Sequence, residues 1–349
     1  MTHRENWLRT IEFRNPEWIP CGVGFSPITW NTHRNKLEDL CLRHTLLFSG
    51  FQKGGRDFDS FPPYYRPRDT NRDNWGCVWK NELPGLEGMV IEYPLADWSA
   101  LDTYRPPDPA KYTERGEIDW DAVKRSIAEA RKRGDLVGGS GERLFDRLYF
   151  LRGFENLMMD FATDDPHLPK LIDMLWEHER KMVGMWLDIG VDVVSFHTDI
   201  GTQQALMISP EKFRIYLKPM FKDIFQMCRR AGAHVALSSD GCLLEIVDDL
   251  IECGVSVHDP QVRACTLDGI EKAYKGKMCI NLDLDRQLFP FATPDQVREH
   301  VREGVERLAL PEGGLMLQAG IWGGDVSLEN IEALCQAMED YCLSGAPER

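Results

Sequence analysis

One pattern fills the second half of the chain: a short, continuously apolar run ends in polar residues and is followed by a helical segment. Runs of this kind are typical of parallel strands that helices cover on both faces. We predict strands at 192–196, 235–237, 255–257, 278–282 and 315–318. Helices are predicted after them at 210–231, 243–253, 267–274, 294–308 and 328–341. Such regular alternation constrains this part of the chain to an α/β fold.

The first half adds further units of the same kind. A strand is expected within 18–25 and another near Val137, which brings the total close to the eight of a closed barrel. Helices are expected at 2–13, capped by Thr2, and at 120–133, 145–159 and 166–189. A loop is expected through Pro27 and Trp30, and 51–80 reads as a long irregular segment of functional type. The sequence therefore predicts a (β/α)8 TIM barrel, formed as a single domain over 1–349, with an irregular N-terminal loop region over the cleft.

Composition excludes several classes of function. The formal net charge of -15 disfavours a nucleic-acid partner, because phosphate binding needs a basic surface. No apolar run reaches membrane-spanning length and the N-terminus is polar, so we expect no membrane partner and a cytoplasmic protein. The ten cysteines form no Cys-x-x-Cys pair and are expected to be mostly reduced core thiols.

Ionisable residues collect at the ends of the predicted strands. They are His197, Asp199, Asp240, His258 and Asp283. Active sites of α/β barrels lie at the carboxyl ends of the strands, so these side chains are expected to converge. A carboxylic acid that stays protonated could act as a general acid, and we assign catalysis to His197, Asp199 and Asp240. Alternatively, His197, Asp240 and His258 could hold Zn2+, since His and Asp are suitable ligands.

Other residues are predicted to bind substrate. Arg143 could bind a benzoate-type carboxylate, or pair with Glu142, and glutamine amides could bind substrate oxygens. Aromatic residues in the long irregular segment could line an aromatic pocket, although ordinary loop packing explains each of them equally well. Asp240 could instead cap the helix after it, and His197 could be a core histidine. The predicted substrate-binding residues are Glu142, Arg143, Gln203, Gln261, Asp283, Trp75 and Tyr65.

A series of short motifs is similar to one known superfamily. The series comprises Arg4-Glu5-Asn6-Trp7-Leu8, Asp73-Asn74-Trp75-Gly76, Pro94-Leu95-Ala96-Asp97-Trp98, Asp199-Ile200-Gly201-Thr202-Gln203, Ile208-Ser209-Pro210-Glu211-Lys212-Phe213-Arg214, Ser239-Asp240-Gly241, Gly313-Gly314 and Glu329-Asn330-Ile331. In order and spacing they resemble the uroporphyrinogen decarboxylase and corrinoid methyltransferase superfamily. The resemblance implies a distorted TIM barrel with its cleft at the strand C-termini.

Departures from the superfamily's patterns narrow the expected activity. Its decarboxylases carry an Arg-Gln-Ala-Gly-Arg segment that binds substrate carboxylates, and this chain has Cys21-Gly22-Val23-Gly24-Phe25 there. Its thiol-methylating members bind zinc through a His-x-Cys pair and a late Cys. Here the pair falls on Ser238 and Asp240, and the late Cys falls near Gly320 and Ile321. Because both patterns are absent, the chain most resembles the methyltransferases of one-carbon metabolism that demethylate methoxylated aromatics.

The resemblance implies a methyl group moving from a small methylated substrate to the Co(I) of a corrinoid (cobalamin) held by a separate corrinoid-binding protein. O-demethylation of a methoxylated aromatic is the first expectation. A decarboxylase-like lyase on a smaller carboxylic acid, a methylcorrinoid:pterin methyltransferase and a catalytically silent binding protein remain alternatives. Zn2+ is a possible cofactor and a homodimer a possible assembly.

Overall fold

The computed structural model describes residues 1–346, which form two compact units. Unit 1 combines Met1–Asp69, Asn81–Gly88 and the chain from Asp259 onward. Unit 2 combines Thr70–Lys80 with Met89–His258. Both units are therefore assembled from segments that are distant in the sequence, and the prediction of one domain over 1–349 stays a prediction.

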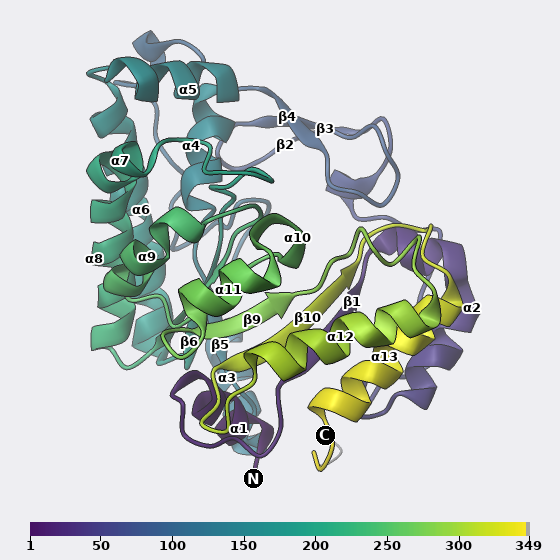
Figure 1. Ribbon diagram of the computed structural model, residues 1–349. Helices are drawn as coiled ribbons and strands as arrows, with labels where there is room; N and C mark the ends of the chain where they lie inside the picture. Colours follow the sequence, from purple (N-terminus) through teal and green to yellow (C-terminus); the bar gives the residue numbers. More distant parts are fainter. Residues whose placement is uncertain (347–349) are drawn as a thin grey trace. The chain divides into compact units, whose positions relative to one another are not determined.

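Unit 1 contains three parallel strands. β1 (Cys21–Phe25) pairs with β10 (Leu315–Ile321), which pairs in turn with β9 (Cys279–Asp283). Side by side in Figure 1 lie α12 (Pro294–Leu308) and α13 (Leu328–Cys342), which contact each other. The remaining helices of this unit are α1 (His3–Ile11), α2 (Pro27–Arg43), the 3-10 turn η1 (Pro63–Tyr65), α10 (Val262–Cys265) and α11 (Leu267–Tyr274).

Unit 2 contains four parallel strands and a small second sheet. The strand order is β5 (Gly138–Ser140), β6 (Val193–His197), β7 (His234–Ser238) and β8 (Val257–His258). β2 (Thr70–Arg72), β3 (Val78–Lys80) and β4 (Met89–Glu92) form the second sheet, which is antiparallel. The helices are α3 (Trp120–Arg133), α4 (Leu144–Arg152), α5 (Phe154–Thr163), α6 (Leu168–Ile189), α7 (Pro210–Lys212), α8 (Lys218–Arg230) and α9 (Val247–Cys253), with 3-10 turns η2 (Trp98–Ala100) and η4 (Leu244–Ile246).

Local sequence signals explain where several helices begin. The hydroxyl of Thr2 accepts a hydrogen bond from the amide of Glu5, so the predicted cap of α1 is confirmed. The predicted loop through Pro27 and Trp30 is wrong. Ser26 caps a helix there and Pro27 occupies its first turn, where proline needs no hydrogen-bond donor.

Two other predicted elements differ in detail. The helix predicted at 145–159 is two helices, because Gly153 adopts a φ of 89° between α4 and α5. The helix predicted at 210–231 contains a π-helical turn, η3 (Phe213–Leu217), just before Pro219. Proline has no N–H to donate to the preceding turn, which accounts for the irregularity at this place.

Parallel strands alternate with helices in both units, and the α/β fold is TIM-barrel-like, as predicted. Seven parallel strands are present among residues 1–346, where eight were expected. The segment 51–80 was expected to be irregular, yet it contains β2 and β3. Within the described residues, none of the helices combines the length and apolar character needed to cross a membrane.

Candidate active site

Five residues lie together at the carboxyl ends of the unit 2 strands, and we call them the strand-end cluster. Its members are Asp146, Tyr149, His197, Asp199 and Asp240. His197 ends β6, while Asp199 and Asp240 follow β6 and β7 directly. Asp146 lies in the first turn of α4, the helix that follows β5. The structure therefore brings together the three residues to which we assigned catalysis.

Backbone hydrogen bonds connect three of these residues. The amide of Asp199 donates to Oδ1 of Asp146 at 3.1 Å, and the amide of Asp240 donates to Oδ1 of Asp199 at 2.9 Å. The hydroxyl of Thr198 accepts from the amide of Phe145 at 2.7 Å, which holds the start of α4 against β6. Three successive strand ends are thus joined by short polar contacts.

Two glycines allow the loops after β6 and β7 to meet. Gly241 has a φ of 93°, and a Cβ on it would lie 2.3 Å from the carbonyl carbon of Gly201. A Cβ on Gly201 would in turn lie 2.8 Å from the amide nitrogen of Cys242. Only glycine accommodates this close approach, which positions Asp199 and Asp240 on adjacent loops.

Burial raises the pKa of Asp146 to about 7, and the neighbouring carboxylate of Asp199 adds to the effect. A hydrogen bond with Tyr149 and the positive charge of Arg143 oppose the shift. Asp146 therefore holds a proton close to neutral pH, which is the property a general acid requires.

His197 has the opposite shift. Its surface is exposed, yet the surrounding protein makes the charged form costly and lowers its pKa. The positive charge of Arg143 lowers that pKa further, whereas Asp199 raises it. His197 is consequently a neutral imidazole at pH 7, with one donor and one acceptor.

The sequence analysis missed Asp146 and Tyr149. Asp146 was hidden inside a run that reads as an ordinary apolar helix, Leu144-Phe145-Asp146-Arg147-Leu148. Two charged residues in the middle of such a run were the available signal, because charges are buried only where they are paired or functional.

Arg147 is the centre of a second group, which is buried in unit 2 and which we call the Arg147 cluster. Its guanidinium is fully buried and lies 3.3 Å from Asp73, 3.0 Å from Glu114 and 3.1 Å from Glu142. The indole N–H of Trp75 donates to Glu142 at 2.8 Å, and the backbone N–H of Arg143 donates to the same carboxylate at 2.8 Å. These contacts give Glu142 and Trp75 a structural role, and substrate contact by either residue stays a prediction.

A third group lies at the strand ends of unit 1. The amide of Gln261 donates to Asp283 at 3.3 Å, and Arg286 lies 3.3 Å from the same carboxylate. Nearby on the sheet, Asn281 donates to Gln318 at 2.9 Å, and Gln318 donates to Asp259 at 3.0 Å. Gln261 and Asp283 are buried, so the prediction that they bind substrate requires a ligand reaching the strand ends of this unit.

The other predicted site residues lie elsewhere. Gln203 is exposed in the loop after β6, and Tyr65 ends η1 in unit 1. His258 is fully buried in β8, and burial lowers its pKa to about 3. Among residues 1–346, no three or more His, Cys, Asp or Glu side chains are arranged to hold a metal ion. The structure thus does not assemble His197, Asp240 and His258 into the predicted zinc site.

Comparison with known proteins adds a family and a fold. The uroporphyrinogen decarboxylase (URO-D) family matches residues 79–341. A methyltransferase from Methanosarcina mazei has a similar structure, with a TM-score of 0.65 and 18% sequence identity, over 97% of this chain and 98% of that chain. This likeness supports the TIM-barrel-like fold.

More distant structures are similar over part of the chain only. A dihydropteroate synthase from Xanthomonas albilineans with 4-aminobenzoic acid covers 61% of this chain and 70% of its own, at 14% identity and a TM-score of 0.36. No curated protein matches the chain significantly. The family match spans well over half of the sequence, and the chain therefore belongs to the uroporphyrinogen decarboxylase family.

Proposed function

We propose that the protein is a methyltransferase that takes the methyl group of a methoxylated aromatic and passes it to a reduced corrinoid on a separate protein. One observation carries the proposal: Asp146 is a buried carboxylic acid that keeps its proton near pH 7, held against Asp199 at the strand ends. The absence of the decarboxylases' arginine segment at Cys21–Phe25 supports a methyl-transferring rather than porphyrinogen-decarboxylating member of the family.

Cleavage of an aryl methyl ether needs a nucleophile and a proton. The reduced corrinoid, when bound, supplies the nucleophile that accepts the methyl group. The bond between the methyl carbon and the ether oxygen breaks, and its electron pair stays on the oxygen. Asp146 gives its proton to that oxygen and becomes a carboxylate, so the product leaves as a neutral phenol.

Neighbouring residues suit the remaining tasks. Arg143 lies within electrostatic reach of both Asp146 and His197 and 3.6 Å from Glu114, and in this proposal its guanidinium binds a carboxylate on the aromatic ring in addition to Glu114. Neutral His197 can donate a hydrogen bond to the substrate without competing for the proton of Asp146. Tyr149 hydrogen-bonds Asp146 and orients its carboxyl group.

No step of this proposal passes through zinc. The residues predicted as zinc ligands do not form a metal-binding group, and His258 is completely buried. The proton on Asp146 provides the charge compensation that a Lewis acid would otherwise supply at the departing oxygen.

Visible spectroscopy tests the proposal. The protein is mixed with a competent corrinoid protein reduced to Co(I) and with methoxybenzoates, methylamines or methylated pterins in turn. Conversion to the methylated corrinoid with methoxybenzoates alone is the expected result. Conversion with pterins alone would support the methylcorrinoid:pterin alternative. Release of carbon dioxide from a small acid without corrinoid would replace the proposal by the decarboxylase-like alternative.

A further inference from the structure

Helix α4 begins without a cap of its own, although it carries Asp146 in its first turn. Arg143 stands at the capping position, and its side chain makes no capping hydrogen bond. The first backbone N–H groups of a helix have no partner inside the helix, so buried ones need an acceptor from elsewhere. The start of α4 is buried, since Leu144, Phe145 and Asp146 are at most 5% exposed. Another element must therefore supply the acceptor.

Thr198 supplies that acceptor from the end of β6. Its hydroxyl oxygen accepts hydrogen bonds from the amide of Phe145 at 2.7 Å and from the amide of Asp146 at 3.4 Å. Thr198 is buried, and its own backbone N–H donates to the carbonyl of Ser238 on β7 at 2.9 Å. That bond ties its position to the sheet, and a β-branched side chain has few rotamers. Thr198 thus caps a helix that lies far away in the sequence.

The next residue along the chain completes the attachment. The amide of Asp199 donates to Oδ1 of Asp146 at 3.1 Å. Two consecutive residues at the end of β6 therefore hold Asp146: Thr198 binds its backbone, and Asp199 binds its carboxyl group. The first contact fixes where the side chain starts and the second fixes where the carboxyl group points, which together define its position.

We propose that Thr198 is the positioning residue of Asp146: its hydroxyl binds the start of α4 and so places the carboxyl group of Asp146 against the backbone of Asp199. The effect on catalysis rests on the proposed function, in which Asp146 is the acid. The effect on Asp146 itself does not, because it follows from the hydrogen bonds between β6 and α4. The two effects can therefore be measured separately.

Loss of the hydroxyl would free two amides beside the Asp146 carboxyl group. Aspartate near the start of a helix readily hydrogen-bonds neighbouring backbone N–H groups, so the carboxylate would exchange one amide donor for two. A carboxylate that gains amide hydrogen bonds is stabilised relative to its acid. The pKa of Asp146 should then fall toward that of an ordinary aspartate. The charged and titratable groups that act on this carboxyl group, Asp199, Tyr149 and Arg143, keep their identity in the variants below.

Two variants of the full-length protein test the positioning role. Thr198→Val keeps the branched shape and removes the hydroxyl, whereas Thr198→Ser keeps the hydroxyl. The ionisation of Asp146 is followed by the 13C resonance of its carboxyl group, which is assigned by its absence in Asp146→Asn. We expect the pKa to fall by about one pH unit or more in Thr198→Val and to stay close to that of the wild type in Thr198→Ser.

An unchanged pKa in folded Thr198→Val would overturn the positioning role. Thr198→Ala also lacks the hydroxyl and adds no bulk, and it gives the same measurement if the valine variant does not fold.

Methyl transfer at pH 6.5 measures the consequence for catalysis. In Thr198→Val, kcat should fall about tenfold with little change in KM, because the acid is displaced while substrate binding is retained. Thr198→Ser should restore kcat. A lowered pKa of Asp146 with unchanged kcat would overturn the catalytic effect. Wild-type protein that is inactive with every donor would contradict the proposed function, and the carboxyl resonance would still decide whether Thr198 positions Asp146.

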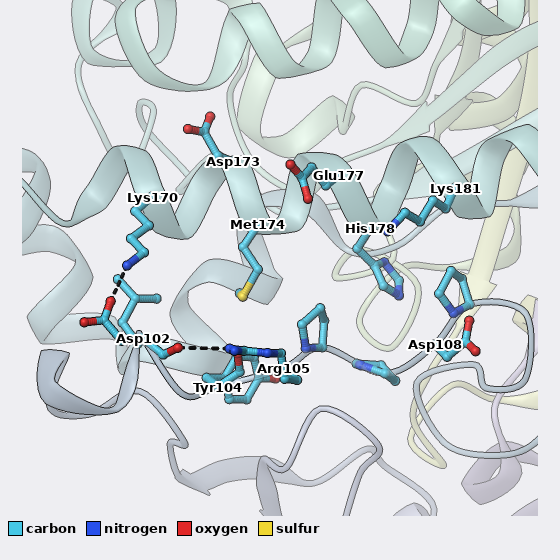
Figure 2. A pocket seen from close by; sticks show the side chains of 14 residues that line it. Asp102, Tyr104, Arg105, Asp108, Lys170, Asp173, Met174, Glu177, His178 and Lys181 are labelled. Atoms are coloured by element: carbon cyan, nitrogen blue, oxygen red, sulfur yellow. Dashed lines mark hydrogen bonds and ion pairs between the residues drawn. The ribbon is translucent and has the colours of Figure 1, made fainter.

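Two substitutions outside the strand-end cluster serve as controls. Thr293→Val removes the hydroxyl that caps α12 in unit 1. Lys170→Met breaks an exposed ion pair beside a pocket of about 540 Å3 in unit 2, where Figure 2 shows Lys170 on α6 reaching Asp102. Both variants should leave kcat and the pKa of Asp146 unchanged. The same fall in that pKa in either control would overturn its assignment to the hydroxyl of Thr198.

Discussion

The backbone N–H of Asp199 donates a 3.1 Å hydrogen bond to the carboxyl group of Asp146. This contact holds the residue pair together at the end of β6 and the start of α4, although the two residues lie far apart in the sequence. Burial, with the charge of Asp199 adding to the effect, raises the pKa of Asp146 to about 7. The pair resembles other sites in which two carboxyl groups take different roles because their surroundings differ.

Methyl transfer should depend on the proton of Asp146. Above pH 7 the group ionises, so the rate should fall about tenfold for each pH unit once deprotonation dominates. Asp146→Asn should lower the rate by about 100-fold or more at pH 6.5 and remove this pH dependence. Initial rates between pH 6 and 9 measure both effects. An unaltered profile in Asp146→Asn would exclude Asp146 as the acid.

The same shift affects stability. The folded-state pKa of Asp146 is raised, so the stability it contributes is complete below about pH 4 and is lost as the pH rises to about 7. Asp146→Asn has no carboxyl group to ionise at this position. Between pH 5 and pH 8.5 the free energy of unfolding should therefore fall by roughly 1–3 kcal/mol less in the variant than in the wild type. Urea denaturation at both pH values is the measurement. Asp188→Asn, at an exposed aspartate, is the control and should follow the wild type.

Asp240 should matter for catalysis and little for folding. Its side chain is exposed, while its backbone amide makes the hydrogen bond to Asp199. Asp240→Asn leaves that amide in place, so its melting temperature should stay close to that of the wild type while methyl transfer is lost. Near-wild-type turnover would remove Asp240 from the catalytic set.

Gly241 should tolerate no side chain. Gly241→Ala combines an unfavourable φ of 93° with a Cβ 2.3 Å from Gly201, and we expect it to destabilise the protein by about 3 kcal/mol or more. Gly232→Ala is the matched control. Its φ is 85° but nothing lies within 4 Å of the added Cβ, so a loss of about 1 kcal/mol is expected. Equal losses in the two variants would show that backbone strain, and not the contact with Gly201, sets the requirement.

Removing the cation from the Arg147 cluster should be severe. Arg147→Leu leaves Asp73, Glu114 and Glu142 without their buried partner, and a loss of about 3–5 kcal/mol is expected at pH 7. Arg9→Leu removes an exposed ion pair with Glu5 and should cost no more than about 0.5 kcal/mol. Thermal unfolding of both variants distinguishes a stabilising cluster from one that contributes nothing.

Elements with strong local signals were predictable. Helix α3 occupies the predicted residues, since Asp119 caps it and Gly134 ends it in a left-handed conformation. The sequence predicted that His197, Asp199 and Asp240 lie at strand ends, because the carboxyl ends of parallel strands lie at the same edge of a sheet.

Features that depend on tertiary contacts were not predictable. Nothing in the sequence reveals that Arg147 and Trp75 contact the carboxylate of Glu142, and its predicted contact with substrate stays a prediction. The raised pKa of Asp146 comes from burial and from Asp199, and both exist only in the folded protein. The buried position of His258 likewise follows from how β8 is covered, and two residues of strand are too few to show it in the sequence.

The pairing of β1 with β10 has a consequence for how the protein is made. Cys21 lies opposite Leu317 in the sheet. The first strand to leave the ribosome therefore pairs with a strand that is synthesised near the end of the chain. The continuous stretch Met89–His258, by contrast, is synthesised without interruption and can begin to fold first. During translation, β1 must therefore wait with an uncovered edge, and premature termination before Leu315 would leave that edge available to a neighbouring chain.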